Sequence, residues 1–266
     1  MSVLIVIPAR YASVRYPGKP LVPLRGSTGL AKTLVQRSWE AAQNVQSADR
    51  VVIATDDDRI RDAAQAFGAE VVMTSPDCKN GTERCAEAIE NLGGGYDVVV
   101  NFQGDAPLTP PWFVEELIAA LLARDDVAMV TPVLRCDGNA LRRLKEDRAN
   151  GRVGGTTAIF DATGRAMYFS KEVIPFTSKA YSDEAQTPVF HHVGVYAFRP
   201  PALATYQTWP VGRLESLEGL EQLRFIENGH RVQCVEVEAR GKKFWELNNP
   251  EDVPKLERMM AEMEIE

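Results

Sequence analysis

Cysteine is scarce in this sequence, and its scarcity excludes two kinds of site. The four cysteines (Cys78, Cys85, Cys136 and Cys234) are spread over 266 residues, and no two form a C-x-x-C pair. Neither a zinc site nor a disulfide framework is therefore indicated, and reduced, partly buried thiols are expected. Histidine is scarce too. His191 and His192 are adjacent with no third histidine nearby, which argues against a zinc site there.

Long hydrophobic runs and an excess of basic charge are also missing. No apolar run approaches the roughly 20 residues that span a bilayer, and residues 1–8 lack the basic start and cleavage site of a signal peptide. We therefore expect a cytoplasmic protein with no membrane partner. The net charge of −7 argues against a nucleic-acid partner, although it leaves room for a local basic site that binds a small polyanion.

What the sequence does contain is an alternation of apolar runs and amphipathic stretches. Residues 3–7 form a continuous apolar run that Pro8 ends, as expected of a strand buried on both faces. Further strands are predicted at 51–54, 70–73 and 97–101, and helices at 32–43, 59–67, 82–92 and 110–123. Thr55 or Asp56 is the expected cap of the second helix, and Asn80 or Thr82 that of the third. This alternation predicts βαβ units and a parallel sheet.

The pattern changes after a strand predicted at 127–133. A charged helix is expected at 135–150, and strands at 156–160, 167–170 and 189–198 surround a polar loop at 177–187. A helix at 215–228, a strand at 231–237 and a helix starting at Asn249 complete the chain. The prediction is one α/β domain over residues 1–266, with a mostly parallel mixed sheet flanked by helices and a smaller β-rich lobe within about 150–210.

The first candidate site is the loop at residues 8–20, directly after the first strand. Ligands of open α/β sheets lie beyond the carboxyl ends of the strands, and this loop places Arg10, Arg15 and Lys19 there. Guanidinium and ammonium groups suit a polyphosphate. Neither G-x-x-x-x-G-K-[ST] nor G-x-G-x-x-G occurs here, so this is neither a Walker loop nor a dinucleotide fingerprint. A solvated basic loop is the alternative.

Two more segments carry candidate ligands. Asn101-Phe102-Gln103-Gly104-Asp105 ends another buried strand, and Asp105 is a hard oxygen ligand suited to Mg²⁺ beside phosphates, or a simple cap of the turn. Asn80-Gly81-Thr82 opens a helix, where free N–H groups can face a ligand or serve only to start the helix.

A fourth constellation combines a strand and a helix. His192, Gly194 and Tyr196 share one strand face, and Glu218, Glu221 and Gln222 share one helix face in the predicted elements. These polar groups could bind sugar hydroxyls, or the helix face could simply be solvated.

Four blocks of sequence resemble one known family, the 3-deoxy-manno-octulosonate (Kdo) cytidylyltransferases. The blocks are I-P-A-R-Y-A-S-V-R-Y-P-G-K-P at 7–20, N-G-T-E-R at 80–84, Q-G-D-A-P at 103–107, and Y-F-S-K at 168–171 with the later H-V-G-V-Y and L-E-Q-L-R. They occur in the family's order over nearly the whole chain. The resemblance implies a Rossmann-like nucleotidyltransferase fold and a homodimer joined through the β-rich lobe. It also implies a role in lipopolysaccharide biosynthesis, with capsule biosynthesis as the alternative. The implied reaction is CTP + Kdo → CMP-Kdo + diphosphate, with Mg²⁺ as the cofactor.

The resemblance also implies a role for individual residues. Arg10, Arg15, Lys19 and Asp105 would be catalytic, with the three cations on the triphosphate, and Asp105 and Asn248 would bind Mg²⁺. The CTP-binding set would comprise Ala9, Arg10, Lys19, Asn80, Gly81, Thr82, Arg84 and Gln103. The sugar acid would be bound by Ser170, Lys171, His192, Tyr196, Glu221 and Gln222. The residues identify no general base.

Three departures from the family pattern bear on the metal site and the acceptor. Ala106 replaces the usual glutamate of Q-G-D-E-P, and Asn248 replaces the usual aspartate of D-T-P-E-D. An amide brings no charge, so we expect weaker metal binding, or participation of a nearby acid such as Glu246. Residues 153–157 replace the usual N-x-V-K block, so an 8-amino octulosonate or a nonulosonic acid could be the acceptor instead.

Two further functions fit the same residues. One is a non-catalytic nucleotide-binding homologue, which Asn248 favours and the retained Arg10, Arg15, Lys19 and Asp105 oppose. The second is a sugar-phosphate nucleotidyltransferase that uses UTP or dTTP.

Overall fold

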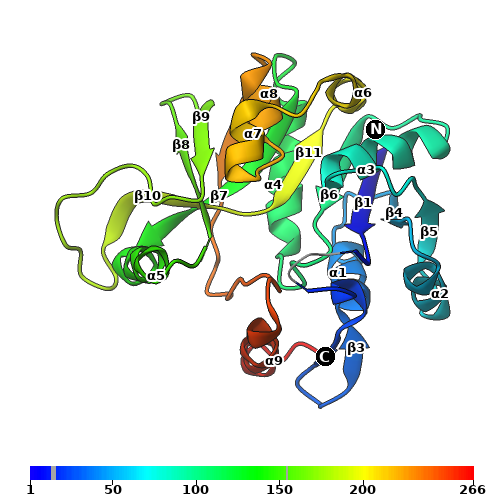
Figure 1. The fold of residues 1–266 in the computed structure, drawn as a ribbon, viewed down its shortest axis with the longest axis horizontal. Helices are drawn as coiled ribbons and strands as arrows, with labels where there is room; N and C mark the ends of the chain where they lie inside the picture. The colour runs from blue at the N-terminus through cyan, green and yellow to red at the C-terminus, as the bar shows by residue number, and fades with distance from the viewer. Residues whose placement is uncertain (13–15, 154) are drawn as a thin grey trace. The chain divides into compact units, whose positions relative to one another are not determined.

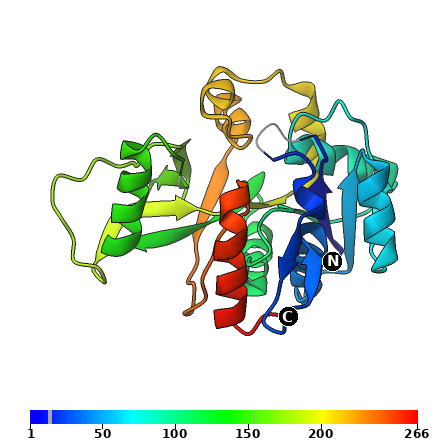
Figure 2. The same cartoon turned by 60° about the horizontal axis from the view of Figure 1, so that its bottom comes forward.

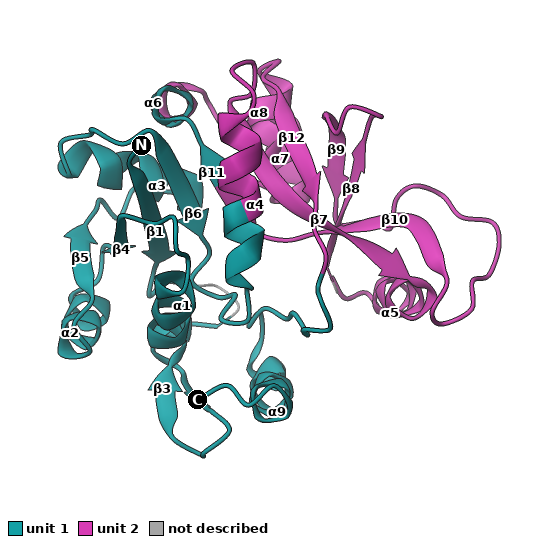
Figure 3. Ribbon diagram, turned by 180° about the vertical axis from the view of Figure 1, so that it is seen from behind, with its two compact units in different colours: residues 1–115, 197–204, 239–266 teal, residues 116–196, 205–238 magenta. Residues whose placement is uncertain are grey.

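The chain folds into two compact units, each assembled from separate stretches of sequence. The structure, a computed structural model, describes residues 1–12, 16–153 and 155–266. Unit 1 comprises residues 1–115, 197–204 and 239–266, and unit 2 comprises residues 116–196 and 205–238 (Figure 3). Most of the predicted β-rich lobe, residues 150–196 and 205–210, falls in unit 2. The predictions at Arg15 and Gly154 lie outside the described residues.

Unit 1 contains a parallel sheet in the order β5-β4-β1-β6 (Figure 1). The strands are β1 (Val3–Ala9), β4 (Arg50–Thr55), β5 (Glu70–Met73) and β6 (Val98–Phe102). Val3 to Ile7 are 0% exposed, as the apolar run predicts for a strand covered on both faces. The helices α1 (Leu34–Gln43), α2 (Asp58–Ala66) and α3 (Gly81–Asn91) pack on these strands. The predicted parallel α/β arrangement is confirmed.

Side chains just before each of these helices determine where the helix begins. Thr33 accepts from the N–H of Gln36, and Asn80 from that of Glu83, so the expected cap at Asn80 is confirmed. The expected cap of α2 at Thr55 or Asp56 is wrong, because Asp57 accepts from the N–H of Arg59. Thr55 completes β4 instead.

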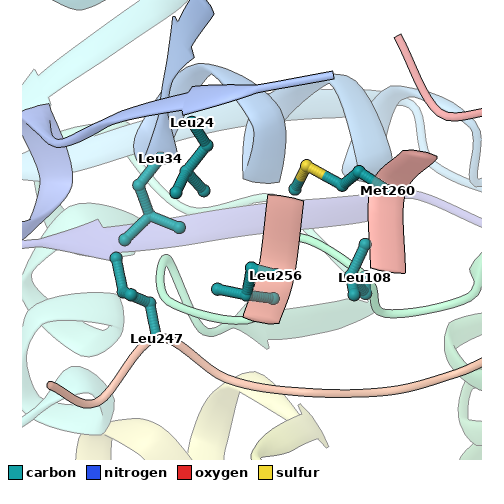
Figure 4. Packing of buried hydrophobic residues seen from close by; sticks show 6 residues of the cluster. All are labelled: Leu24, Leu34, Leu108, Leu247, Leu256 and Met260. Atoms are coloured by element: carbon teal, nitrogen blue, oxygen red, sulfur yellow. The ribbon is translucent and has the colours of Figure 1, made fainter. Parts of the chain in front are cut away.

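The C-terminal segment completes the hydrophobic core of unit 1. A hairpin of β2 (Pro23–Arg25) and β3 (Ala31–Thr33) follows the short helix η1 (Lys19–Leu21), and α9 (Val253–Glu262) follows η2 (Pro250–Asp252). Figure 2 shows α9 in red beside the blue N-terminal strands, and its contact is with β2. One buried cluster joins Leu24, Leu34, Leu108, Leu247, Leu256 and Met260 (Figure 4). Leu247 thereby anchors the loop that precedes η2 to this core.

Unit 2 is mostly antiparallel. Strand β7 (Met129–Asp137) pairs antiparallel with β10 (Gln186–His192) and parallel with β12 (Val232–Glu236). Strand β10 also pairs antiparallel with β8 (Thr156–Phe160), and β8 pairs antiparallel with β9 (Ala166–Ser170). The helices are α5 (Gly138–Ala149), α7 (Arg213–Glu218) and α8 (Leu223–Glu227). Three elements span the division between the units: α4 (Pro111–Leu122), β11 (Val195–Phe198) and α6 (Pro200–Thr208).

Three predicted elements of this region had the wrong limits. The helix expected at 135–150 begins only at Gly138, because β7 continues through Asp137, whose side chain then caps α5. The strand expected at 189–198 is interrupted at Val193 and Gly194. The helix expected at 215–228 is two short helices, because Gly219 adopts the left-handed φ of 62° that ends α7. Glu218, Glu221 and Gln222 therefore do not share one helix face.

Candidate active site

The first cluster of predicted site residues lies in unit 1, at the carboxyl ends of β1 and β6. These strands are parallel neighbours, so the loops that follow them leave the sheet at the same edge. Lys19 follows β1 and Asp105 follows β6, and Lys19 Nζ lies 2.6 Å from Asp105 Oδ2. Their side chains are 16% and 25% exposed. The structure thus brings together a cation and the proposed metal ligand, as the sequence predicted.

Other residues of the CTP-binding set also lie in unit 1. Arg10 donates to the backbone oxygen of Lys79 at 3.4 Å, next to the cap of α3. Thr82 is 1% exposed and Ala9 3% exposed, so each can offer a ligand little more than one face. The arrangement joins the loop after β1 to the start of α3, where the first-turn N–H groups favour an anion.

Gly81 occupies a position where no larger residue fits without movement. A Cβ there would lie 2.9 Å from Gln103 Nε2, 3.1 Å from Asn101 Nδ2 and 3.2 Å from Pro8 Cγ. Asn101 is 0% exposed, and neither polar atom of its side chain meets a hydrogen-bond partner within the described part of the chain. A buried strand was predicted here, but no structural role was predicted for the amide of Asn101, although an asparagine in a run of valines was a visible signal. The absence of a side chain at Gly81 therefore allows Gln103 to lie close to the start of α3.

Arg84 has a structural position that the sequence did not indicate. Its side chain is 3% exposed, and Nη2 lies 3.1 Å from Asp56 Oδ1, after β4. Nη1 donates to Thr74 Oγ1, after β5. Arg84 thus joins α3 to two strand ends, and its predicted contact with CTP stays a prediction.

Asn248, the second proposed metal ligand, lies in a loop that is hydrogen-bonded to Asp105, the first. The N–H of Leu247 donates to the backbone oxygen of Asp105 at 2.9 Å, which places Asn248 one residue away. Asp252 Oδ2 accepts from the N–H groups of Asn248 and Asn249, at 3.0 and 2.8 Å. Ala106 stands where the family pattern has a glutamate. It is fully buried, so its side chain faces the interior.

These residues fit the magnesium ion that the family implies. Among the described residues, no group of three or more His, Cys, Asp or Glu could hold a metal by itself. Mg²⁺, however, is commonly bound through one or two protein oxygens together with waters and substrate phosphates. Asp105 keeps lone pairs that Lys19 does not use, and Asn248 adds an amide oxygen.

The sugar-binding set lies in unit 2, and the structure brings three of its six residues together. Tyr196 Oη donates to Gln222 Oε1 at 3.2 Å, and the rings of His192 and Tyr196 have centroids 5.6 Å apart. His192 is 5% exposed and Gln222 1% exposed. Burial, followed by the charge of His191, lowers the pKa of His192 to about 3, so its imidazole is neutral.

Glu218 connects the end of β9 to α7. Its carboxylate accepts from Ser170 Oγ at 2.7 Å and from the N–H of Lys171 at 2.9 Å. The hydroxyl proton of Ser170 is therefore already used within unit 2. Burial, followed by the charge of Glu218, also raises the pKa of Tyr168. From the sequence, Glu218 was expected only as one of several polar residues, and this connecting role was not predicted.

A buried ion pair fixes the turn between α7 and α8. Arg224 donates to both carboxylate oxygens of Glu215, at 2.6 and 2.7 Å, and its guanidinium lies over the ring of Tyr206. Glu227 accepts from the N–H groups of Leu214 and Glu215 at the start of α7. These contacts place Glu221 and Gln222 between the two helices.

The cysteines form no disulfide in the structure. All four are free thiols, as expected; Cys78 is half-buried and the other three are buried. Within residues 1–12, 16–153 and 155–266, no helix is long and apolar enough to cross a membrane.

Comparison with known proteins shows the family of this chain. Residues 4–232 match a family model described as "Cytidylyltransferase". A 3-deoxy-manno-octulosonate cytidylyltransferase of Maricaulis maris is 44% identical over 261 residues, which cover 98% of each chain. An 8-amino-3,8-dideoxy-manno-octulosonate cytidylyltransferase of Shewanella frigidimarina is 39% identical and covers 98% of this chain and 99% of the relative.

A solved structure supports the same assignment. A CMP:2-keto-3-deoxy-manno-octonic acid synthetase complexed with CTP superposes with a TM-score of 0.82 at 30% identity, covering 99% of this chain and 100% of that chain. The fold and the family model together define a nucleotidyltransferase that belongs to the cytidylyltransferases. Within that class, the chain belongs to the 3-deoxy-manno-octulosonate cytidylyltransferase family. The fold class predicted from the sequence is confirmed.

Proposed function

We propose that this enzyme transfers CMP from CTP to 3-deoxy-manno-octulosonate and releases diphosphate. The observation that carries the proposal is the pairing of Lys19 with Asp105 where β1 and β6 end, in a chain that matches this family over almost its full length. The basic loop after β1 and the start of α3 supply groups for a triphosphate. The His192, Tyr196 and Gln222 cluster supplies neutral polar groups for a sugar.

The chemistry requires positioning and charge neutralisation. The anomeric hydroxyl oxygen attacks the α-phosphorus, the bond to the bridging oxygen breaks, the hydroxyl proton is lost, and diphosphate departs. Arg10, Arg15 and Lys19 hold the triphosphate and stabilise the charge that develops on the leaving group. Asp105 and Asn248 would hold Mg²⁺, which would neutralise charge on the phosphate oxygens.

Further properties belong to the same proposal. Ala9, Asn80, Gly81, Thr82, Arg84 and Gln103 surround the cytidine, and Ser170, Lys171, His192, Tyr196, Glu221 and Gln222 surround the sugar acid. The enzyme works in the cytoplasm as a homodimer, in lipopolysaccharide biosynthesis. These properties rest on the family resemblance.

The experiment is a diphosphate-release assay with CTP, Mg²⁺ and a panel of sugar acids. The panel contains 3-deoxy-manno-octulosonate, its 8-amino analogue and a nonulosonic acid, and UTP replaces CTP in a parallel series. We expect the highest kcat/KM with CTP and 3-deoxy-manno-octulosonate. No diphosphate with any acceptor would overturn the proposal, and a preference for the 8-amino acid would change the substrate.

One observation favours a second candidate function, a nucleotide-binding homologue without turnover. Asn248 stands where the family has an aspartate, so the metal site has one charge fewer. A pure binder would bind CTP without turnover, and D105N would leave its CTP affinity largely intact. In an enzyme, D105N should abolish turnover.

A further inference from the structure

Tyr11 connects the two described ends of the loop at residues 8–20, which are residues 8–12 and 16–20. The N–H of Gly18 donates to the backbone oxygen of Tyr11 at 2.9 Å. Gly18 adopts the left-handed φ of 71°, and a Cβ there would lie 3.1 Å from Cζ of the Tyr11 ring and 3.2 Å from its hydroxyl oxygen. The ring of Tyr11 therefore packs directly against the backbone of Gly18, which leaves little room for a side chain there.

Gly18 determines the direction in which Lys19 leaves the backbone. It is the residue just before η1, which begins at Lys19, and its backbone oxygen accepts from the N–H of Leu21 at 2.9 Å. Lys19 Nζ lies 2.6 Å from Asp105 Oδ2. A displacement of Gly18 therefore moves the ammonium group of Lys19 relative to Asp105. Misplacing a group that positions a substrate by about 1 Å can lower the rate about 100-fold.

The start of α2 holds the ring of Tyr11 in place. The guanidinium carbon of Arg59, in the first turn of α2, lies 3.3 Å from the centroid of that ring and makes a cation–π contact. Asp57 accepts from Nε and Nη2 of Arg59, at 2.9 and 2.6 Å, and also caps α2. The direction of Arg59 is thus tied to the start of the helix. Because α2 also contacts η1, the helix, the ring and Lys19 form one connected structure.

We propose that Tyr11 is a positioning residue, whose ring, held by Arg59, fixes Gly18 and thereby the direction in which Lys19 presents its ammonium group to the triphosphate of CTP. The inference rests on the proposed function. Tyr11 acts through Lys19 and supplies no group to the nucleotide. Its loss therefore affects the handling of CTP only while Lys19 is present, which distinguishes it from a residue that the protein needs only to fold.

A double-mutant cycle between Tyr11 and Lys19 is the main test. Y11A removes the ring and should lower kcat/KM for CTP about tenfold, a part of the loss expected from K19M itself. In the K19M background the same substitution should have almost no further effect, because the group that Tyr11 positions is already absent. KM for the sugar acid should stay unchanged. Equal losses in the parent and in the K19M background, or no loss in the parent, would overturn the inference.

Conservative variants show which part of each side chain matters. Y11F keeps the ring and should keep most of the parent kcat/KM, and a loss as large as that of Y11A would contradict a role for the ring. R59M should lower kcat/KM for CTP about two- to fivefold, the change that an exposed cation–π contact accounts for. Arg61 provides the matched control, because it lies on the same helix and pairs with Asp58 and Asp62. R61M should leave kcat/KM unchanged, and a loss equal to that of R59M would refute a role for the Arg59 contact.

A structural measurement decides the inference without turnover. Amide hydrogen exchange, followed by NMR without nucleotide, reports the hydrogen bond between the Gly18 N–H and Tyr11. Y11A should speed the exchange of the Gly18 amide about tenfold, while the amides of β1 exchange as in the parent. R59M should change the Gly18 amide in the same direction, and it keeps the test valid if Y11A does not fold. Unchanged exchange at Gly18 in the folded variants would overturn the inference.

Failure of the proposed function would give a different result. A parent protein that releases no diphosphate with any sugar acid refutes that function. The double-mutant cycle is then measured by calorimetry as the affinity for CTP, and the exchange of the Gly18 amide is independent of both assays. Circular dichroism checks that each variant is folded before it is compared with the parent.

Discussion

Lys19 and Asp105 lie 86 positions apart in the sequence, yet their charged groups are 2.6 Å apart at the carboxyl ends of neighbouring strands. Each side chain is partly buried, so each charge has lost part of its contact with water, and the ion pair compensates for part of that loss. A bound triphosphate would provide an anion for Lys19 in place of Asp105, and a bound metal ion would provide a cation for Asp105 in place of Lys19. The ion pair therefore keeps both groups in place until the nucleotide binds.

The first prediction concerns this pair. K19M should lower kcat/KM for CTP roughly 10²-fold, because a cation that stabilises the leaving phosphates is lost. D105N should lower turnover at least as much, and the double variant should lose less than the product of the two effects, since the groups act together. Steady-state kinetics measures all three.

A second ion pair in unit 1 provides the control. Lys32 Nζ lies 3.0 Å from Glu40, with similar exposure, but not in the loops after β1 and β6. K32M should leave kcat/KM unchanged. A loss equal to that of K19M would show that the effect is one of general charge and not of position.

The second prediction concerns the residue that departs from the family pattern. N248D should bind Mg²⁺ more tightly in the presence of CTP, because a carboxylate adds a full charge to a ligand set that has only one. Calorimetric titration of Mg²⁺ into the enzyme with a non-hydrolysable CTP analogue measures the affinity. N249D places the same charge on the adjacent residue, and an equal gain there would refute a specific role for Asn248.

The third prediction concerns the stability of the turn that carries Gln222. R224M should lower the free energy of unfolding by about 3–5 kcal/mol, because it leaves the buried carboxylate of Glu215 without its positively charged partner. Replacing both partners by apolar residues should recover part of this loss. The exposed pair Arg50 and Glu70 is the control, and R50M should cost less than about 1 kcal/mol. Urea unfolding of the four proteins gives the comparison.

The fourth prediction follows from the buried imidazole of His192. Its pKa is lowered to about 3 in the folded protein, against about 6.5 when unfolded, so the unfolded chain binds more protons between these values. The contribution of neutral His192 to the free energy of unfolding is therefore fully present above the pKa of the unfolded chain, and it is lost as the pH falls below that value. As the pH falls from about 7.5 to about 5, His192 should lower the free energy of unfolding by roughly 2 kcal/mol.

Urea unfolding at the two pH values tests this directly. H192N should lose less stability than the parent on acidification, by about the amount assigned to His192. H230N, which replaces an exposed histidine, is the control. An equal pH dependence in the parent and H192N would contradict the prediction.

The sequence predicted the parts of the fold that depend on local pattern. The buried strand at residues 3–7 and the start of a helix at Asn80 each depend on residues that are neighbours in the sequence, and both predictions were correct. The break at Gly219 was missed because the apolar and polar residues on either side of it also fit one continuous helix, and only the positive φ reveals the stop. The extension of β7 to Asp137 was missed because its pairing partner, β10, lies about fifty residues later.

The site could be predicted where residue type alone carries the chemistry. Lys19 and Asp105 follow predicted parallel strands, so their proximity was expected. The contact between His192 Nε2 and Thr131 Oγ1, 2.8 Å apart, was missed because a threonine in an apolar strand carries no signal of its partner, and His192 faces it only through the pairing of distant strands.

One buried cluster makes unit 1 depend on two distant stretches of the chain. Residues 239–266 contribute Leu247, Leu256 and Met260 to the cluster that also buries Leu24, Leu34 and Leu108 (Figure 4). Removing residues 239–266 would therefore expose the three N-terminal members of the cluster to water. The same truncation would remove Asn248, so core stability and the proposed second metal ligand would be lost together.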